Sequence, residues 1–150
     1  MDTEKRRIEA KAEIETYIAK LRYALANGAK INFQEERLVD DGRDIKYTNK
    51  YTMATLFPNE NPTDVLRKEL MTLTVEDYMH SVKDIRFPKR SEMRVFGKTY
   101  NSDEDVYIKI RVELLDPSGI GNHTAFVMSF HFAEAKFIKE DFPYRKEKDV

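Results

Sequence analysis

The chain has 150 residues, enough for one domain with a substantial core and too few for two domains of ordinary size. Its 26 Lys and Arg nearly balance 27 Asp and Glu, so the net charge of −1 gives no sign of a nucleic-acid binder and any basic surface must be local. The absence of cysteine excludes thiolate catalysis, disulfides and cysteine-based zinc sites. No apolar run reaches membrane-spanning length and the first residues contain no hydrophobic signal segment, so we expect a cytoplasmic protein without a membrane partner.

The segment from about Thr3 to Asn27 has the periodicity of one long helix, and Asn27–Gly28 is a typical helix stop. The stretch before Ile14 is mostly charged. We therefore expect it to project into solvent, or to pair with a partner protein or with a second copy of the chain. The apolar stripe that packs on the core is predicted to consist of Ile14, Tyr17, Ile18, Leu21, Ala24 and Leu25.

Short elements follow in the middle of the chain. A strand is predicted through Ile31 and Phe33, then a turn at residues 40–44, a returning strand or loop at 45–51 and a short helix at 50–57.

A clearer helix is predicted over residues 61–73. Asn61 can cap its first turn, and Pro62 suits the first helical position because proline has no N–H to satisfy there. Thr74 then resembles a second helix cap, which predicts a short helix over residues 75–82.

After this the period changes to two, which predicts strands at residues 91–98, 105–115 and 123–134. Turn-forming residues lie between them, so an antiparallel meander is the economical pairing. The predicted fold class is therefore α+β, a single domain over residues 1–150 with N-terminal helices packed on one face of a C-terminal antiparallel sheet. The tail at 145–150 is polar and is expected to be frayed.

Alternation assigns a face to each side chain of these strands. In the last strand it groups Phe126 and Met128 with Phe130 and Phe132, opposite Val127, Ser129 and His131. In the middle strand Val106, Ile108 and Ile110 face the helices. If the three apolar faces share one core, the polar side of the sheet presents Arg94, Lys98, Tyr107, Lys109, Arg111 and His131.

Such a face suits RNA, since Lys and Arg neutralise phosphates and aromatic rings stack on exposed bases. It also suits RNA cleavage by attack of a 2′-hydroxyl on the adjacent phosphorus, which needs a base, an acid and cations. An ordinary solvated sheet face is the alternative, and the pattern alone favours it. The three histidines, His80, His123 and His131, lack metal-ligand spacing, so we expect no metal and no cofactor.

Several segments occur in an order and spacing that resemble a known family: "ANGAKINF", "NPTDVLRKELMTLTVEDY", "VFGK", "VYIKIRVEL", "SFHFAE" and "FPY". Together they resemble the MqsR-family toxins of bacterial type II toxin–antitoxin systems, closest to the longer members of Gram-positive bacteria, over about residues 24–144. The resemblance implies a RelE-like α+β fold and a metal-independent ribonuclease that cleaves mRNA and is neutralised by a cognate antitoxin protein.

The family's active-site positions fall here on His80, Arg94, Tyr107 and His131. His80 stands where the better-known branch has lysine, Arg94 where it has glutamine, and His131 where it has its C-terminal lysine; Tyr107 matches. The resemblance and the predicted polar face agree on Arg94, Tyr107 and His131. The remaining candidates are Lys109 and Arg111 for phosphate binding and Lys98, Ser129 and Phe96 for other substrate contacts; for Lys98, at a strand end, contact with solvent alone is the alternative.

Two functions follow from the sequence. The first is a toxin ribonuclease in which Tyr107 and His131 are the acid–base pair, Arg94 and Lys109 stabilise the phosphorane and His80 assists. The second is a non-catalytic module of a mobile element that binds a protein or nucleic acid with the same fold. The three departures at the family's active-site positions favour the second.

Overall fold

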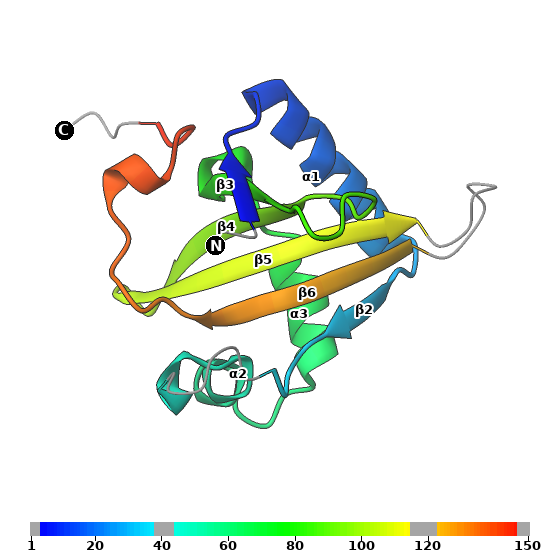
Figure 1. Cartoon of the computed structure of the whole chain (residues 1–150). Coiled ribbons are helices and arrows are strands. Elements are labelled where there is room, and N and C mark those ends of the chain that lie inside the picture. The colour runs from blue at the N-terminus through cyan, green and yellow to red at the C-terminus, as the bar shows by residue number, and fades with distance from the viewer. Residues whose placement is uncertain (1–3, 38–43, 115–122, 147–150) are drawn as a thin grey trace.

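The computed structural model describes residues 4–37, 44–114 and 123–146, which form one α+β unit built on an open, mostly antiparallel six-stranded sheet (Figure 1). The strands are β1 (Glu4–Arg7), β2 (Lys30–Phe33), β3 (Tyr78–Asp84), β4 (Met93–Tyr100), β5 (Glu104–Leu114) and β6 (His123–Phe132). The α-helices are α1 (Lys11–Ala26), α2 (Asn49–Leu56) and α3 (Pro62–Leu70), with short 3-10 helices at Ile45–Tyr47, Val75–Asp77 and Lys139–Asp141.

The sheet order is β1-β3-β4-β5-β6-β2, and only the β2–β6 pair is parallel among the described strands. The predicted antiparallel meander of β4, β5 and β6 is confirmed. The predicted turn at 40–44 lies, apart from Asp44, outside the described residues, as does the connection between β5 and β6.

One face of the sheet carries the main core. Helices α1 and α3 cover this face, as Figure 1 shows with both helices behind β5 and β6. The N-terminus of α3 is capped as predicted, since the Asn61 side chain accepts hydrogen bonds from the backbone N–H groups of Thr63 and Asp64. The most deeply buried side chains include Ile14, Leu21, Leu66, Leu70, Phe96, Ile108 and Phe130.

The prediction of one helix from Thr3 is wrong for residues 4–10. Helix α1 begins at Lys11, and Glu4–Arg7 instead forms β1, an exposed edge strand paired antiparallel with β3. Charged side chains are common on edge strands because they oppose pairing with other chains. Of the helical surface predicted to meet a partner or a second copy before Ile14, only Lys11–Glu13 is therefore helical among the described residues.

The helix predicted over 75–82 is also wrong. Thr74 and Asp77 do form a local turn, in which the Thr74 N–H donates to the Asp77 carboxylate, but the turn ends after Asp77. Tyr78–Asp84 is an inner strand, β3, whose residues 78–82 are all buried. Because both faces of β3 are covered, its sequence lacks the alternation by which a half-exposed strand is recognised.

A register shift in β6 changes the predicted faces. Lys109 pairs with Ser129 but Ile110 pairs with Val127, so Met128 is an extra residue that bulges from the ladder. Val127 therefore points into the core, while Phe126 and Met128 are only half buried. The predicted grouping of Phe126 and Met128 with Phe130 and Phe132 is wrong, whereas Ser129 and His131 lie on the polar face as predicted.

Helix α2 completes the edge of β6 where β2 ends. The Asn49 side chain donates to the carbonyl of Met128 and accepts from the N–H of Phe130, and Thr52 Oγ1 accepts from the N–H of Phe132. These side chains satisfy backbone groups that an exposed edge would leave unpaired. They also hold the second half of β6, which carries Ser129 and His131, in place.

The C-terminal segment, residues 133–146, turns back across the sheet face that the helices leave open. Phe142 is buried against Met79, Val82 and Val95 in a second, smaller core, with Phe137 beside it. Residues 145 and 146, predicted to fray, make specific contacts: the Arg145 guanidinium lies 3.7 Å from the Phe142 ring centroid, and Lys146 N–H donates to Glu76. The rest of the predicted tail, residues 147–150, lies outside the described residues.

Candidate active site

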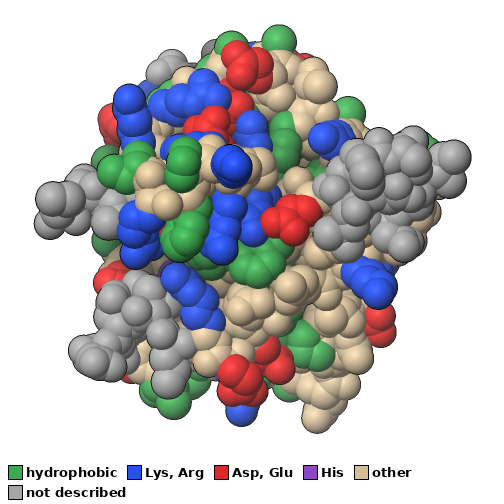
Figure 2. Space-filling model, turned by 45° about the vertical axis from the view of Figure 1, so that its right-hand side comes forward, with side chains coloured by type: hydrophobic (Ala, Val, Ile, Leu, Met, Phe, Trp, Pro, Cys, Tyr) green, Lys and Arg blue, Asp and Glu red, His purple; other side chains and the backbone are tan. Residues whose placement is uncertain are grey.

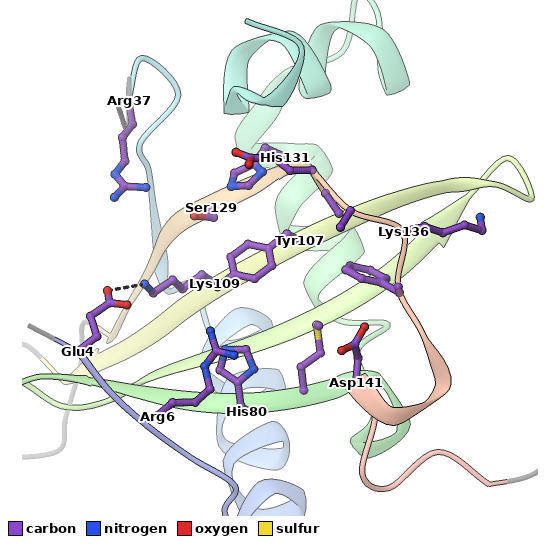
Figure 3. A pocket seen from close by; sticks show the side chains of 15 residues that line it. Glu4, Arg6, Arg37, His80, Tyr107, Lys109, Ser129, His131, Lys136 and Asp141 are labelled. Carbon is purple, nitrogen blue, oxygen red and sulfur yellow. Dashed lines mark hydrogen bonds and ion pairs between the residues drawn. The ribbon is translucent and has the colours of Figure 1, made fainter. Parts of the chain in front are cut away.

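A pocket of about 470 Å³ lies on the open face of the sheet, opposite the face covered by α1 and α3. Its floor is formed by side chains of β3, β5 and β6, and its walls by β1, the segment after β2 and the C-terminal segment (Figure 3). Five of the sequence-predicted site residues line it: His80, Tyr107, Lys109, Ser129 and His131.

Strand register explains why these five residues converge. Tyr107 pairs directly with His131, and Lys109 pairs with Ser129 in the adjacent row. On its other side Lys109 faces Val95, which in turn faces His80. Directly opposed residues of neighbouring strands point to the same face, so the pleat alone brings side chains from β3, β5 and β6 together.

The rings of Tyr107 and His131 are stacked, with centroids 5.4 Å apart and planes inclined by 23°. Nδ1 of His131 lies 2.9 Å from the carbonyl oxygen of Phe132. A carbonyl only accepts, so Nδ1 carries the proton and, in the neutral ring, Nε2 carries the lone pair. The site thus holds an imidazole of defined tautomer beside a phenol, a pair able to move protons.

His80 is buried on the floor of the pocket, and its Nε2 atom has no hydrogen-bond partner among the described residues. Burial, together with the positive charges of Arg6 and Lys109, lowers the pKa of His80 to about 4. Asp141 and Glu4 oppose this shift without overcoming it. His80 is therefore neutral at neutral pH and can accept or donate a hydrogen bond there without adding charge.

Positive charge in the pocket comes from Lys109 and from Arg6 on β1. The Lys109 ammonium forms an ion pair with Glu4 at 3.2 Å (dashed in Figure 3), so β1 supplies a cation and a carboxylate to the same site. Arg37 and Lys136 line the pocket as well. Glu4, Arg6, Arg37 and Lys136 lie outside the meander and were not among the residues predicted from the sequence. For Glu4 and Arg6, a run of charged residues is compatible with an edge strand, but it does not identify the strand with which it pairs.

Three predicted residues lie on the side of the sheet opposite this pocket, so the prediction that they share a face with Tyr107 and His131 is wrong. Arg94 pairs with Ile110, Phe96 with Ile108 and Lys98 with Val106, all of them core positions. Phe96 is fully buried, and the Lys98 ammonium donates to Thr72 Oγ1. The prediction failed because both faces of β4 are covered, so its apolar residues did not mark the core face.

Arg94 instead belongs to a buried network around Glu9. Its guanidinium donates two hydrogen bonds to the Glu9 carboxylate, at 2.8 and 2.9 Å, and lies 4.6 Å from the Tyr17 ring centroid. Ser81 also donates to Glu9, and the Tyr144 hydroxyl donates to the Glu9 carbonyl. Burial acts to raise the pKa of Glu9, but the hydrogen bonds from Arg94 and Ser81 outweigh it and lower the pKa.

Arg111 was predicted to bind phosphate, and it does not line this pocket. It follows Lys109 by two residues along β5, where its guanidinium pairs with Glu113 at 2.6 Å and lies 5.0 Å from the Phe126 ring centroid.

Close packing explains why position 97, in the "VFGK" segment, is a glycine. A Cβ atom at this position would lie 2.6 Å from a ring carbon of Phe137 and 3.0 Å from one of Phe142. The absence of a side chain therefore lets the C-terminal segment approach the sheet and bring Lys136 and Asp141 to the pocket wall.

In the described part of the chain, no group of three or more His, Asp and Glu side chains could hold a metal ion, and no helix is long and apolar enough to cross a membrane. A scan against models of protein families and searches of curated proteins and of solved structures found no match to this chain.

Proposed function

We propose that this chain is a metal-independent endoribonuclease that cleaves mRNA, and that it acts as the toxin of a type II toxin–antitoxin pair. The observation that carries the proposal is the convergence of Tyr107, His131 and Lys109 in one pocket. The resemblance of residues 24–144 to the MqsR family supports it, and an α+β fold is compatible with a RelE-like ribonuclease.

The proposed reaction is attack of a ribose 2′-oxygen on the adjacent phosphorus, with rupture of the bond to the 5′-oxygen. His131 Nε2 accepts the proton of the 2′-hydroxyl, and the Tyr107 hydroxyl donates a proton to the leaving 5′-oxygen. The products are a 2′,3′-cyclic phosphate and a 5′-hydroxyl. Proton exchange with water then restores both side chains.

Lys109 and Arg6 supply the positive charge that the pentavalent phosphorane needs. Arg6 takes the role that the sequence analysis gave to Arg94, because Arg94 lies on the other side of the sheet. Neutral His80 is placed to hydrogen-bond a phosphate oxygen or a ribose hydroxyl beside Lys109.

The test is cleavage of end-labelled single-stranded RNA by the purified protein, with the products analysed for cyclic phosphate. We expect His131→Ala and Tyr107→Phe each to lower kcat by roughly 100-fold or more, the usual contribution of general acid–base catalysis. Lys98→Gln is the matched control, because Lys98 was a site candidate and lies on the other face. Intact RNA, or variants that cleave like wild type, would remove the catalytic proposal and favour the non-catalytic binding module.

The toxin assignment has its own test. Induced expression in bacteria should arrest growth with loss of mRNA, and co-expression of a small neighbouring gene should restore growth. If the protein cleaves RNA in vitro but its expression is harmless, the ribonuclease proposal would stand and the toxin proposal would fall.

A further inference from the structure

A strongly basic region lies next to the pocket. Residues 4–7 and 83–92 are neighbours because β1 pairs with β3, and together they contain seven Lys and Arg but three Asp and Glu. Two of the carboxylates are engaged by arginines of the same region, in the pairs Arg7–Glu92 and Arg86–Asp84. Figure 2 shows Lys and Arg side chains gathered around exposed hydrophobic atoms. In a chain of net charge −1, this local excess is a distinct feature.

An aromatic ring projects from this region. Phe87, in the turn between β3 and β4, is 43 % exposed. The guanidinium of Arg90 lies 4.1 Å from its ring centroid and that of Arg86 lies 5.7 Å away. Two successive backbone hydrogen bonds, Phe87 N–H to Asp84 and Arg90 N–H to Phe87, hold the turn, and Lys83 donates to the Arg90 carbonyl at 2.6 Å.

The turn begins at the rim of the pocket. Val82 pairs with Arg6 and Asp84 pairs with Glu4, and both Arg6 and Glu4 line the pocket. Asp84 follows His80, on the pocket floor, by four positions along β3, which corresponds to about 13 Å. An RNA strand that leaves the pocket along β1 and β3 therefore reaches the turn within a few nucleotides.

We propose that this turn is a binding subsite for single-stranded RNA that flanks the cleaved phosphate. A base stacks on the Phe87–Arg90 pair, and Lys83, Lys89 and Arg6 neutralise the adjoining phosphates. Stacking on aromatic or guanidinium planes and contacts with phosphate oxygens are the general means of holding a single strand. This inference rests on the proposed function for the location of the cleaved phosphate, while the binding itself is measured separately.

The first measurement is the affinity for a fluorescent 12-nucleotide RNA that is 2′-O-methylated throughout and so cannot be cleaved. We expect Phe87→Ala to weaken binding about fivefold or more, the effect of losing one stacked base. Arg90→Glu should weaken it and also reduce the slope of log affinity against log salt by about 1 or more. Circular dichroism checks that both variants are folded.

Matched controls come from α1, which covers the other face. Tyr23→Ala removes an exposed aromatic ring and Lys20→Glu reverses an exposed charge, and both should bind within about twofold of wild type. Wild-type affinity in Phe87→Ala and Arg90→Glu, or equal losses in the α1 controls, would overturn the subsite.

The second measurement compares cleavage of a dinucleotide with cleavage of an unmodified 12-nucleotide RNA. A dinucleotide spans the cleaved bond but does not extend to the turn, so Phe87→Ala should reduce kcat/KM about fivefold more for the longer substrate. Equal reductions for both substrates would show that Phe87 acts on the pocket and would overturn the inference. If the wild-type protein cleaves neither substrate but Phe87→Ala weakens binding of the uncleavable RNA, the proposed function is contradicted and the subsite is supported.

Discussion

The carboxylate of Glu4 lies 3.2 Å from the ammonium of Lys109, so the first strand places a negative charge on the cation at the centre of the candidate site. Under the proposed function, a substrate phosphate would take the place next to Lys109 that this carboxylate occupies. Glu4 is half exposed and belongs to an edge strand of four exposed residues, whereas the Lys109 side chain is nearly buried. Glu4 and an incoming anion therefore compete for Lys109.

Replacing Glu4 with Gln should strengthen anion binding. An ion pair with one exposed partner contributes about 0.2–1 kcal/mol, so we expect affinity for an uncleavable dinucleotide to rise between about 1.4-fold and fivefold. Glu36→Gln is the control, because Glu36 forms an exposed pair with Lys50 and does not line this pocket. Unchanged affinity in Glu4→Gln would show that Glu4 does not compete with the ligand.

His80 should make stability fall with acid. Its pKa is lowered to about 4 in the folded protein, against about 6.5 unfolded, so between these values only the unfolded chain binds the proton. Stability attributable to His80 is therefore unaffected above pH 7 and is lost as the pH falls from about 6.5 to 4.

The variant His80→Gln cannot titrate at this position. Between pH 7 and pH 4.5, urea denaturation should show it losing less stability than wild type, by a difference on the order of 2 kcal/mol. Parallel curves of unfolding free energy against pH for the two proteins would contradict the shifted pKa.

The Glu9–Arg94 pair should matter for stability and not for catalysis. Glu9 is 2 % exposed, and removal of one partner of a buried pair leaves the other charge uncompensated. We expect Glu9→Gln and Arg94→Met each to lower the free energy of unfolding by about 3 kcal/mol at pH 7. Glu15→Gln, on the exposed side of α1, should change it little.

The pH dependence of this pair has a defined sign. Because the folded pKa of Glu9 is depressed, its contribution is complete above the unfolded value of about 4.3 and is lost as the pH falls through the lower folded value. The difference in free energy of unfolding between wild type and Glu9→Gln should therefore become smaller as the pH falls. If Arg94→Met lost most of its kcat for RNA cleavage at a temperature where it is folded, Arg94 would be part of the site after all.

Gly97→Ala should destabilise the C-terminal segment. The new methyl group would lie 2.6 Å from the Phe137 ring, and overpacking of this kind costs about 1–3 kcal/mol. In a Phe137→Ala background the clash with Phe137 is removed and only the 3.0 Å approach to Phe142 remains, so the same substitution should cost clearly less, as thermal denaturation of the four proteins would show. Equal costs in both backgrounds would mean that the segment does not press on Gly97.

The sequence predicted the meander and the face on which four side chains lie: Tyr107, Lys109, Ser129 and His131. Strand β5 alternates regularly between apolar and polar residues, and its pairing with β6 puts the opposed side chains on the same face. Arg94 was misplaced for a physical reason. Val95 packs under Phe142 while Phe96 packs in the main core, so β4 is apolar on both faces and alternation does not identify the core side.

The remaining differences concern contacts that are distant in sequence. The assignment of β1 depends on its pairing with β3, and no local pattern in "EKRR" announces that partner. The bulge at Met128 shifts the phase of β6 by one residue, which moves Phe126 and Val127 to the opposite faces from those predicted.

The return of the C-terminal segment across Gly97 has a consequence for the order of biosynthesis. The pocket is lined from Glu4 at one end of the described chain to Asp141 near the other. A nascent chain emerging from the ribosome can assemble the meander as soon as β6 is free, but Phe137 and Asp141 emerge later. Under the proposed function, a ribosome-bound intermediate would thus carry the acid–base pair in an unwalled groove, and the enclosed site would form only when translation had passed these residues.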